Sequence, residues 1–344
     1  MGRVKGLALR SNYRALPHKA VFWYYVGTLY SMKKRLLTGL QSSGTLHIGN
    51  YFGALKPFVD IYRDYESHLM IADLHALTTV RDGHVLRQNI IDVVKDYTAV
   101  GVDPQEAIVF KQSDVPEHTE LAWVFECLVT VPFLMQGHAY KDKVAKGIEP
   151  TAGLFNYPML MAADILLYDA AVVPVGEDQR QHIEYAREAA NKFNLAYGDT
   201  FIPPQEMILK GVGVVPGTDG QKMSKSYKNT IPLFASREDI QKAVMSIVTD
   251  SSGNRPENVY ALHRLLKTDA ELAPLYEANQ GKYKNLKDAL VDDLDTFITP
   301  MREKRASITD AEVQNILADG ATRARERACA KMKMVREIIG ISLP

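Results

Sequence analysis

Short apolar runs alternate with amphipathic segments over the first two thirds of the chain, and this alternation restricts the fold more than any other feature. Apolar runs occur at 36–38, 69–72, 107–110 and 171–175, and helix-type periodicity separates them, most clearly at 86–99. Strands that alternate with helices at this spacing are typical of a parallel sheet covered by helices. The sequence therefore predicts an α/β domain with a parallel sheet.

The pattern changes near residue 235. Helix-type periodicity continues without a convincing strand at 237–249, 258–266, 285–298 and 311–339. A segment rich in Gly, Lys and Ser, 210–230, precedes the change and predicts a mobile loop. We therefore expect an α/β domain over 32–235 and an all-helical domain over 236–344.

Residues 1–31 form a separate N-terminal extension. Five basic side chains surround or precede the apolar stretch 21–26, and no small-residue cleavage site follows it. The segment has three interpretations: a targeting peptide, a flexible extension, or a spurious upstream start with translation beginning at Met32. We favour the last, because Met32-Lys33-Lys34-Arg35 leads directly into the first predicted strand. Peptides from residues 1–31 in mass spectra of the native protein would contradict it.

The net charge is zero, with 41 basic and 41 acidic residues, which argues against recognition of a partner by bulk positive charge. The charges are unevenly placed, however. Residues 1–59 hold nine Lys or Arg and no acid, 60–235 hold 15 basic and 24 acidic residues, and 236–344 hold 17 of each. Neutrality is thus a sum of opposite segments, and local basic patches remain available for a nucleic acid.

Two further absences bear on the class of protein. Cys127 and Cys329 belong to no C-x-x-C pair, so we expect neither a disulfide framework nor a structural metal. We expect the protein to occupy a reducing compartment. The longest apolar candidate, 20–30, is too short to span a bilayer. We therefore expect a cytoplasmic protein without a membrane partner.

The segment 38–50, T-G-L-Q-S-S-G-T-L-H-I-G-N, joins the first predicted strand to a helix. An open α/β sheet binds nucleotides at such turns, where glycines allow close backbone approach and helix-start N–H groups attract phosphate. His47 and Asn50 lie three residues apart and can both donate hydrogen bonds to phosphate oxygens. The same residue types serve ordinary caps and turns, so this segment alone leaves a structural role open.

A second motif, K-M-S-K-S at 222–226, lies in the long Gly-rich loop. Lys222 and Lys225 could close over a polyphosphate and stabilise the negative charge that develops during its transfer. Alone, such a loop is more often a solvated basic segment. H-I-G-N after the first strand, followed by K-M-S-K-S before a helical domain, resembles the class I aminoacyl-tRNA synthetases.

Two stretches indicate the amino acid. Tyr157, Met161 and Asp164 in Y-P-M-L-M-A-A-D lie on one helix face. A buried carboxylate there needs a donor, which a ligand's indole N–H or phenol O–H, or a neighbouring protein group, would supply. The second stretch, V-P-V-G-E-D-Q-R-Q-H at 173–182, ends a strand at the same edge of the sheet.

From Arg35 to about Ile339 the chain closely resembles the bacterial-type tryptophanyl-tRNA synthetases, through H-I-G-N-Y-F-G-A, L-R-Q-N at 86–89, M-A-A-D-I-L, G-E-D-Q and K-M-S-K-S. The resemblance implies a Rossmann-like, doubly wound parallel sheet followed by an anticodon-binding helical domain. It implies that the tryptophan-binding residues are Leu37, Gly39, Gln41, Tyr157, Met161, Asp164, Val173, Val175 and Gln179. It implies that the ATP-binding residues are Gln41, Ser42, Ser43, Gly49, Asn50, Lys141, Gly176, Glu177, Asp178, Lys222, Met223, Ser224, Lys225 and Ser226. The implied catalytic residues are His47, Asn50, Lys222 and Lys225.

The resemblance also implies the partners: L-tryptophan, ATP with Mg²⁺, tRNA(Trp) and a second copy of the chain. A run of basic residues within 321–336 is a candidate contact for tRNA, or a solvated terminal helix. Two departures from the family concern Leu37, where an aromatic residue is frequent, and Gln41-Ser42-Ser43-Gly44, where Q-P-[ST]-G is usual. We expect the first to alter packing around the indole rather than specificity.

Three alternatives remain. The tyrosyl enzymes share the architecture. A nucleotidyltransferase of the same superfamily would also carry an H-x-G-x motif and a lysine loop, without need of the Tyr157, Met161 and Asp164 pocket. A binding paralogue without catalysis would be expected to lose the lysines of the loop, and this chain has both Lys222 and Lys225.

Overall fold

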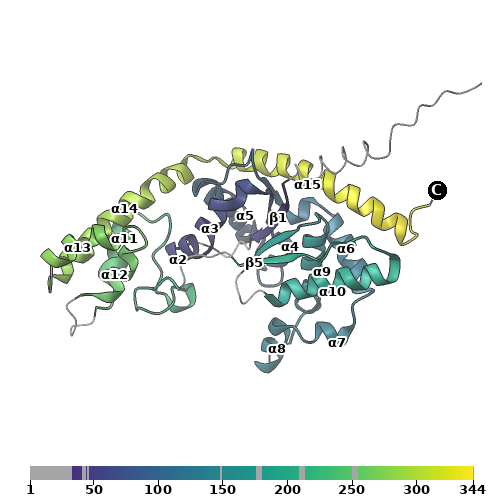
Figure 1. The fold of residues 1–344 in the computed structure, drawn as a ribbon, viewed down its shortest axis with the longest axis horizontal. Coiled ribbons are helices and arrows are strands. Elements are labelled where there is room, and N and C mark those ends of the chain that lie inside the picture. Colours follow the sequence, from purple (N-terminus) through teal and green to yellow (C-terminus); the bar gives the residue numbers. More distant parts are fainter. Residues whose placement is uncertain are drawn as a thin grey trace, which may run out of the picture. The chain divides into compact units, whose positions relative to one another are not determined.

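The computed structural model describes residues 33–40, 44, 46–147, 149–175, 180–208, 214–249 and 255–343. Residues 34–344 form one compact unit (Figure 1). The expectations for residues 1–31 lie outside the described residues. Five strands form one sheet: β1 (Arg35–Leu40), β2 (Glu66–Ile71), β3 (Ile108–Lys111), β4 (Val172–Val175) and β5 (Gln205–Ile208).

All neighbouring strands pair in parallel, in the order β3-β2-β1-β4-β5. The chain runs outward from β1 to β3 and then returns to the other side of β1 for β4 and β5. This confirms the predicted doubly wound sheet. The direction reverses between β1 and β4, so a crevice is expected at the carboxyl ends of these two strands.

Helices cover the sheet and make up the rest of the chain. The helices that lie between or beside the strands in sequence are α2 (Ile48–Asn50), α3 (Lys56–Ile61), α4 (Asp73–Ala76), α5 (Gly83–Ala99), α6 (Glu117–Glu126), α7 (Val131–Leu134), α8 (His138–Ala145), α9 (Ala152–Leu166) and α10 (Arg180–Tyr197). The later helices are α11 (Arg237–Met245), α12 (Glu257–His263), α13 (Asp269–Ala278), α14 (Tyr283–Ser307) and α15 (Asp310–Ile338). A helical C-terminal region was predicted and is confirmed.

The last helix, α15, packs against the edge strand β3. Val313 and Leu317 join the apolar cluster on one face of the sheet, which includes Leu36, while Met332 joins the cluster on the other face. Between them Gly320 touches the strand, and a Cβ at this position would overlap the carbonyl oxygen of Val109. The helix therefore closes the sheet edge at a separation that only glycine permits.

The basic run of α15 is directed to the rest of the chain. Five of its six cations contact carboxylates or carbonyls there: Arg323 with Pro104 and Ala107, Arg325 with Glu117, Arg327 with Glu66, Lys331 with Asp169, and Arg336 with Glu120. The run therefore makes ion pairs and hydrogen bonds within the chain, although Arg325 and Arg327 stay 54% and 46% exposed. These cations attach the helix to the α/β region.

Some helices begin earlier than predicted or were missed. Helix α9 starts at Ala152, after Thr151, whose side chain accepts from the Leu154 amide. It continues through the buried Pro158, although proline usually marks a helix start. Helix α13 begins with a capping box of Thr268 and Glu271, a signal that the sequence contains.

Strand β5 was also missed. Its sequence, Gln205-Glu206-Met207-Ile208, carries only two apolar residues. An edge strand needs no continuous apolar run, because one of its sides pairs with no other strand.

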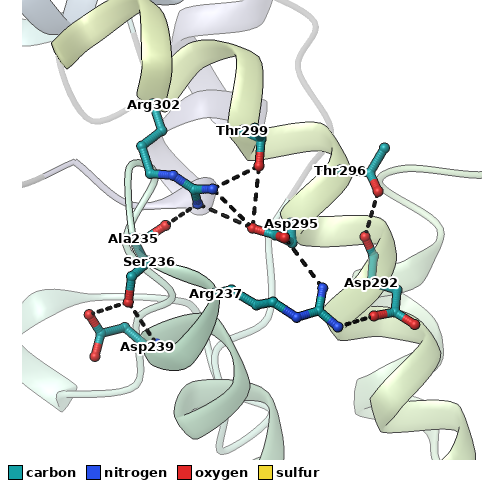
Figure 2. A network of polar contacts seen from close by, with 9 residues as sticks. All are labelled: Ala235, Ser236, Arg237, Asp239, Asp292, Asp295, Thr296, Thr299 and Arg302. Carbon is teal, nitrogen blue, oxygen red and sulfur yellow. Dashed lines mark hydrogen bonds and ion pairs between the residues drawn. The ribbon is translucent and has the colours of Figure 1, made fainter.

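The segment that leaves the K-M-S-K-S loop is fixed to α14 by a polar network (Figure 2). Arg302 donates to the carbonyl oxygen of Ala235 at 2.6 Å and to Asp295 at 3.2 Å. Arg237, at the start of α11, reaches Asp295 and Asp292 on the same helix. The first residues after the loop are therefore anchored to α14, through its side chains Arg302 and Asp295.

Candidate functional site

A cavity of about 530 Å³ lies at the carboxyl ends of β1, β2 and β4, where the strand order reverses. Six of the nine residues expected to bind tryptophan line it: Leu37, Gly39, Tyr157, Met161, Asp164 and Val173. Gln41 and Gln179 lie outside the described residues, as does the side chain of Val175. The structure thus brings together, from β1, α9 and β4, side chains that are far apart in sequence.

Asp164 is the charged group in this mostly apolar wall and is 1% exposed. Gln112 Nε2 donates to its Oδ1 at 2.8 Å, and His75 Nε2 lies 2.9 Å from its Oδ2. His118 Nδ1 lies 2.6 Å from Oδ1, off the straight line of an ideal N–H donor. Burial alone would raise the pKa of Asp164, but His118 and His75 outweigh it and lower the pKa to about 2. The carboxyl group is therefore ionised at neutral pH.

Sequence reasoning missed the partners of Asp164. His75 follows β2, Gln112 follows β3, and His118 lies in α6. The signal was present in part, because polar residues directly after buried parallel strands converge at one edge of the sheet. Tyr157 adds a polar group to the wall, and its hydroxyl lies 3.0 Å from His182 Nε2.

The helix start at His47 is closed by a reciprocal cap. His47 Nδ1 accepts from the Asn50 amide at 3.3 Å, and Asn50 Oδ1 accepts from the His47 amide at 3.1 Å. Burial, with a smaller effect of Lys225, lowers the pKa of His47 to about 4. The imidazole is therefore neutral at pH 7, with its hydrogen on Nε2. It can donate a hydrogen bond to a ligand, but it brings no positive charge.

The K-M-S-K-S loop lies against this helix start. The Ile48 amide donates to the Ile231 carbonyl at 3.0 Å, and the Leu233 amide donates to the Leu46 carbonyl at 2.9 Å. A Cβ at Gly49 would lie 2.9 Å from His47 Nδ1 and 3.2 Å from Met223 Cβ, so glycine is required there. The two motifs, about 170 residues apart, are in direct contact.

Lys225 approaches the turn that follows β1. Its Nζ would lie 3.8 Å from a Cβ at Gly44, whose φ of 84° is in the left-handed region. Burial lowers the pKa of Lys225. A lysine against a glycine turn beside a neutral imidazole offers an anion a positive charge and several N–H donors.

The described part of the loop, 214–230, is organised around Asn229, which is 2% exposed. Asn229 Oδ1 accepts from the Ser224 amide at 2.7 Å, while Nδ2 donates to Asp219 at 2.7 Å and to the Lys222 carbonyl at 3.1 Å. The sequence predicted a mobile loop over 210–230, and the described part of it contains a defined hydrogen-bond network.

The other residues expected to bind ATP are placed unequally. Gln41, Ser42, Ser43, Gly176, Glu177 and Asp178 lie outside the described residues. Lys141 is exposed on α8, a helix that packs on α9, and it does not line the cavity at Asp164, the one at Gly44 or the one at Trp123. A separate cavity of about 730 Å³ extends from Gly44 and Lys228 past Asp96 to Arg305.

In the described ranges, no group of three or more His, Cys, Asp or Glu side chains is arranged to hold a metal ion. No helix there has both the length and the apolar character needed to cross a bilayer.

Residues 31–318 match the family model described as tRNA synthetases class I (W and Y). The chain is 46% identical to the tryptophan–tRNA ligase of Fusobacterium nucleatum, over 90% of this chain and 98% of that protein. It is 45% identical to the tryptophan–tRNA ligase of Rhodopirellula baltica, over 89% and 99%. The tryptophanyl-tRNA synthetase of Campylobacter jejuni, solved with ADP and tryptophan, has a TM-score of 0.84 at 41% identity and covers 89% of this chain and 99% of that one.

Proposed function

The chain belongs to the class I tRNA synthetases for tryptophan and tyrosine, and from this premise we propose that it activates L-tryptophan with ATP and transfers it to the 3′-terminal ribose of tRNA(Trp). The observation that carries the proposal is the ionised Asp164 in the wall of an apolar cavity beside the contact of the two motifs. The cavity volume of about 530 Å³ is in the range of small-molecule sites, roughly 300–1,000 Å³.

Asp164 would select the amino acid. Its carboxylate would accept the indole N–H, while Leu37, Met161 and Val173 would pack on the ring. A ligand without a matching donor, such as phenylalanine, would leave a buried acceptor unpaired. Tyrosine is the second candidate, because its hydroxyl is also a donor and the family includes tyrosine enzymes.

ATP would bind where the two motifs meet, with Mg²⁺ entering as part of the nucleotide substrate. His47, Asn50 and Gly49 would hold the phosphates from the helix start, and Lys222, Met223, Ser224, Lys225 and Ser226 would hold the pyrophosphate. Gln41, Ser42, Ser43, Lys141, Gly176, Glu177 and Asp178 remain proposed contacts, as do Tyr157, Gln179 and Gln41 for the tryptophan amino and carboxylate groups.

The reaction has two steps. In the first, the tryptophan carboxylate attacks the α-phosphorus of ATP, the bond from this phosphorus to the oxygen that bridges to the β-phosphorus breaks, and pyrophosphate leaves. In the second, a ribose hydroxyl of tRNA attacks the acyl carbon of the adenylate, and AMP leaves. Catalysis would rest on placement of the reactants and on stabilisation of charge by Lys222 and Lys225. The neutral His47 would contribute a hydrogen bond from Nε2–H rather than charge.

The helical region 236–344 would bind the tRNA anticodon, since proteins read RNA sequence mainly in single-stranded loops. The proposed contact surface is formed by α11 to α15, and the basic run 321–336 is one candidate within it. We retain the division into an extension, 1–31, a catalytic domain, 32–235, and this helical domain.

A homodimer is proposed as the working form. Exposed apolar side chains gather around a further cavity of about 580 Å³ between α4, α6 and α9, with Leu77 46% and Trp123 66% exposed. Such contiguous apolar surface favours a protein interface. We place the enzyme in the cytoplasm, where ATP and tRNA are available.

The deciding experiment is ATP–pyrophosphate exchange with each of the twenty amino acids. Exchange that depends on tryptophan supports the proposal. Exchange with tyrosine and not tryptophan would change the substrate, and exchange only with another class of acid would favour a nucleotidyltransferase. No exchange with any acid would favour a binding paralogue.

A further inference from the structure

Behind Asp164, on the side away from the cavity, a buried chain of polar contacts continues into the core. His118 Nδ1 lies 2.6 Å from Asp164 Oδ1, and His118 Nε2 lies 2.8 Å from the hydroxyl of Tyr168. All three side chains are at most 1% exposed, and neither His118 nor Tyr168 lines the cavity. We propose that His118 and Tyr168 are positioning residues that orient the Asp164 carboxylate for the indole N–H. This inference rests on the proposed function.

The three donors are divided unequally between the two carboxylate oxygens. Oδ1 faces both Gln112 Nε2 and His118 Nδ1, whereas Oδ2 faces His75 Nε2. A carboxylate has about four lone-pair sites, two on each oxygen. Oδ1 therefore faces two protein groups and Oδ2 only one, so Oδ2 has the acceptor site that we assign to the ligand.

The carboxylate needs such an anchor. The terminal torsion of an aspartate side chain is broad and roughly two-fold, so it does not by itself fix which oxygen faces the cavity. The contacts of Gln112 and His118 with Oδ1 select one orientation. Without His118, rotation of the carboxylate would change the direction of the Oδ2 lone pair toward the ring.

Tyr168 contacts the other nitrogen of His118, with its hydroxyl 2.8 Å from Nε2. Burial raises the pKa of Tyr168, so its hydroxyl keeps its proton and can donate to Nε2. An ionised carboxylate only accepts hydrogen bonds, so a hydrogen on His118 Nδ1 faces Asp164. The tyrosine is itself fixed: its carbonyl accepts from Arg35 at 2.8 Å, and its ring lies 4.9 Å from that of His68.

The chain contains a matched arrangement away from the cavity. His263 Nδ1 lies 3.2 Å from the Tyr276 hydroxyl, and Nε2 lies 2.7 Å from Asp293 Oδ2. This histidine is also 0% exposed, and it lies in the helical region. His263 thus contacts a tyrosine and an aspartate, as His118 does, but away from the amino-acid cavity. Variants of His263 and Tyr276 therefore control for the general effect of losing a buried histidine or a tyrosine hydroxyl.

The experiment compares His118→Gln, His118→Asn and Tyr168→Phe with His263→Gln and Tyr276→Phe. The amide nitrogen of an asparagine at 118 occupies approximately the place of Nδ1 and can still donate to Asp164. The amide nitrogen of a glutamine occupies approximately the place of Nε2, so the donor toward Asp164 is lost. Pyrophosphate exchange is measured with tryptophan and with benzothienylalanine, in which sulfur replaces the indole N–H. The readouts are KM and kcat for each amino acid, and KM for ATP.

We expect the wild-type enzyme to prefer tryptophan by roughly 10- to 100-fold in kcat/KM. His118→Gln and Tyr168→Phe should reduce this preference by about 10-fold and 3-fold through the KM for tryptophan, with KM for ATP unchanged. His118→Asn should retain most of it. The variants of His263 and Tyr276 should lower thermal stability without changing the ratio.

The outcomes separate this inference from the proposed function. Absence of tryptophan-dependent exchange in the wild type refutes the proposed function. Normal exchange, with an unchanged amino-acid preference in the folded His118 and Tyr168 variants, refutes the positioning role alone. If His118→Gln does not fold, Tyr168→Phe, which loses one oxygen atom, decides the question.

Discussion

The amide nitrogen of Ile48 donates to the carbonyl oxygen of Ile231, 3.0 Å away. This bond joins the start of α2 to the segment that leaves the K-M-S-K-S loop. The loop is therefore held at its exit, while Asn229 holds it from within. Its geometry depends on a few polar contacts that can be removed singly.

Asn229→Ala should lower kcat/KM for tryptophan-dependent pyrophosphate exchange by roughly 10- to 100-fold, because three hydrogen bonds within the loop are lost and Lys222 and Lys225 are no longer held in place. The matched control is Asn285→Ala, which removes an exposed amide bonded to Asn279. Equal activities of the two variants would show that the network does not position the lysines.

Asp164→Ala should raise the KM for tryptophan and reduce kcat/KM by about 10- to 100-fold, with much less effect on ATP binding. The carboxylate faces the amino-acid cavity and not the contact of the two motifs. Amino-acid-dependent exchange and direct ATP titration measure the two effects. Equal losses in both would contradict the assignment. Asp164→Asn, which preserves side-chain volume, separates loss of charge from loss of packing.

Gly320→Ala should destabilise the fold by about 2–3 kcal/mol, because the added Cβ would lie 2.6 Å from the carbonyl carbon of Val109 and the helix must move off β3. Chemical denaturation measures the change. Gly83→Ala is the control, since its Cβ meets nothing within 4 Å, and it should stay within roughly 0.5 kcal/mol of wild type. Comparable stability of the two variants would contradict the close approach.

Asp96→Asn should gain stability relative to wild type as pH rises. Burial raises the pKa of Asp96 from 3.8 to about 6, even though Arg305 Nε donates to it at 2.5 Å. The wild-type carboxyl thus favours folding below pH 3.8 and loses that contribution as pH rises through 6. An uncharged Asn does not titrate, so the variant should improve by about 2 kcal/mol between pH 4.5 and 8.

Denaturation of Asp96→Asn and wild type at the two pH values tests this. Asp292→Asn provides the control, because that carboxylate is 64% exposed. A difference between Asp96→Asn and wild type that does not vary with pH would show that Asp96 is not held with a raised pKa.

Trp123→Glu should shift the assembly from two chains toward one, because it places a charge in the exposed apolar patch on α6. Sedimentation velocity at several concentrations measures the mass. Leu195→Glu alters a leucine that is 87% exposed on α10, outside the patch, and should leave the assembly unchanged. A wild-type protein that sediments as one chain would refute the proposed dimer.

The sheet and part of the cavity could be predicted, because strand ends determine which side chains meet. The resemblance to the family placed Leu37, Asp164 and Val173 together, and the structure joins them in one cavity. The contacts of Asp164 with His75 and His118 could not be predicted. They depend on how α4 and α6 pack against α9, which neither periodicity nor spacing specifies.

Order within the K-M-S-K-S loop was equally out of reach. Its composition is that of a flexible segment, and the bonds of Asn229 arise only once residues 214–230 fold around that buried amide. The ion pairs of the basic residues of α15 could not be predicted either. A run of cations in sequence does not reveal that the carboxylates of Glu66, Glu117 and Glu120 lie opposite them.

The closure of β3 by α15 also has a consequence for synthesis. Strand β3 ends at Lys111, but the helix that covers it is complete only at Ile338. While the ribosome makes the intervening residues, the sheet has an uncovered edge, and such edges pair readily with strands of other chains. The time between the emergence of β3 and the docking of Gly320 therefore sets the period during which the nascent chain is exposed to aggregation.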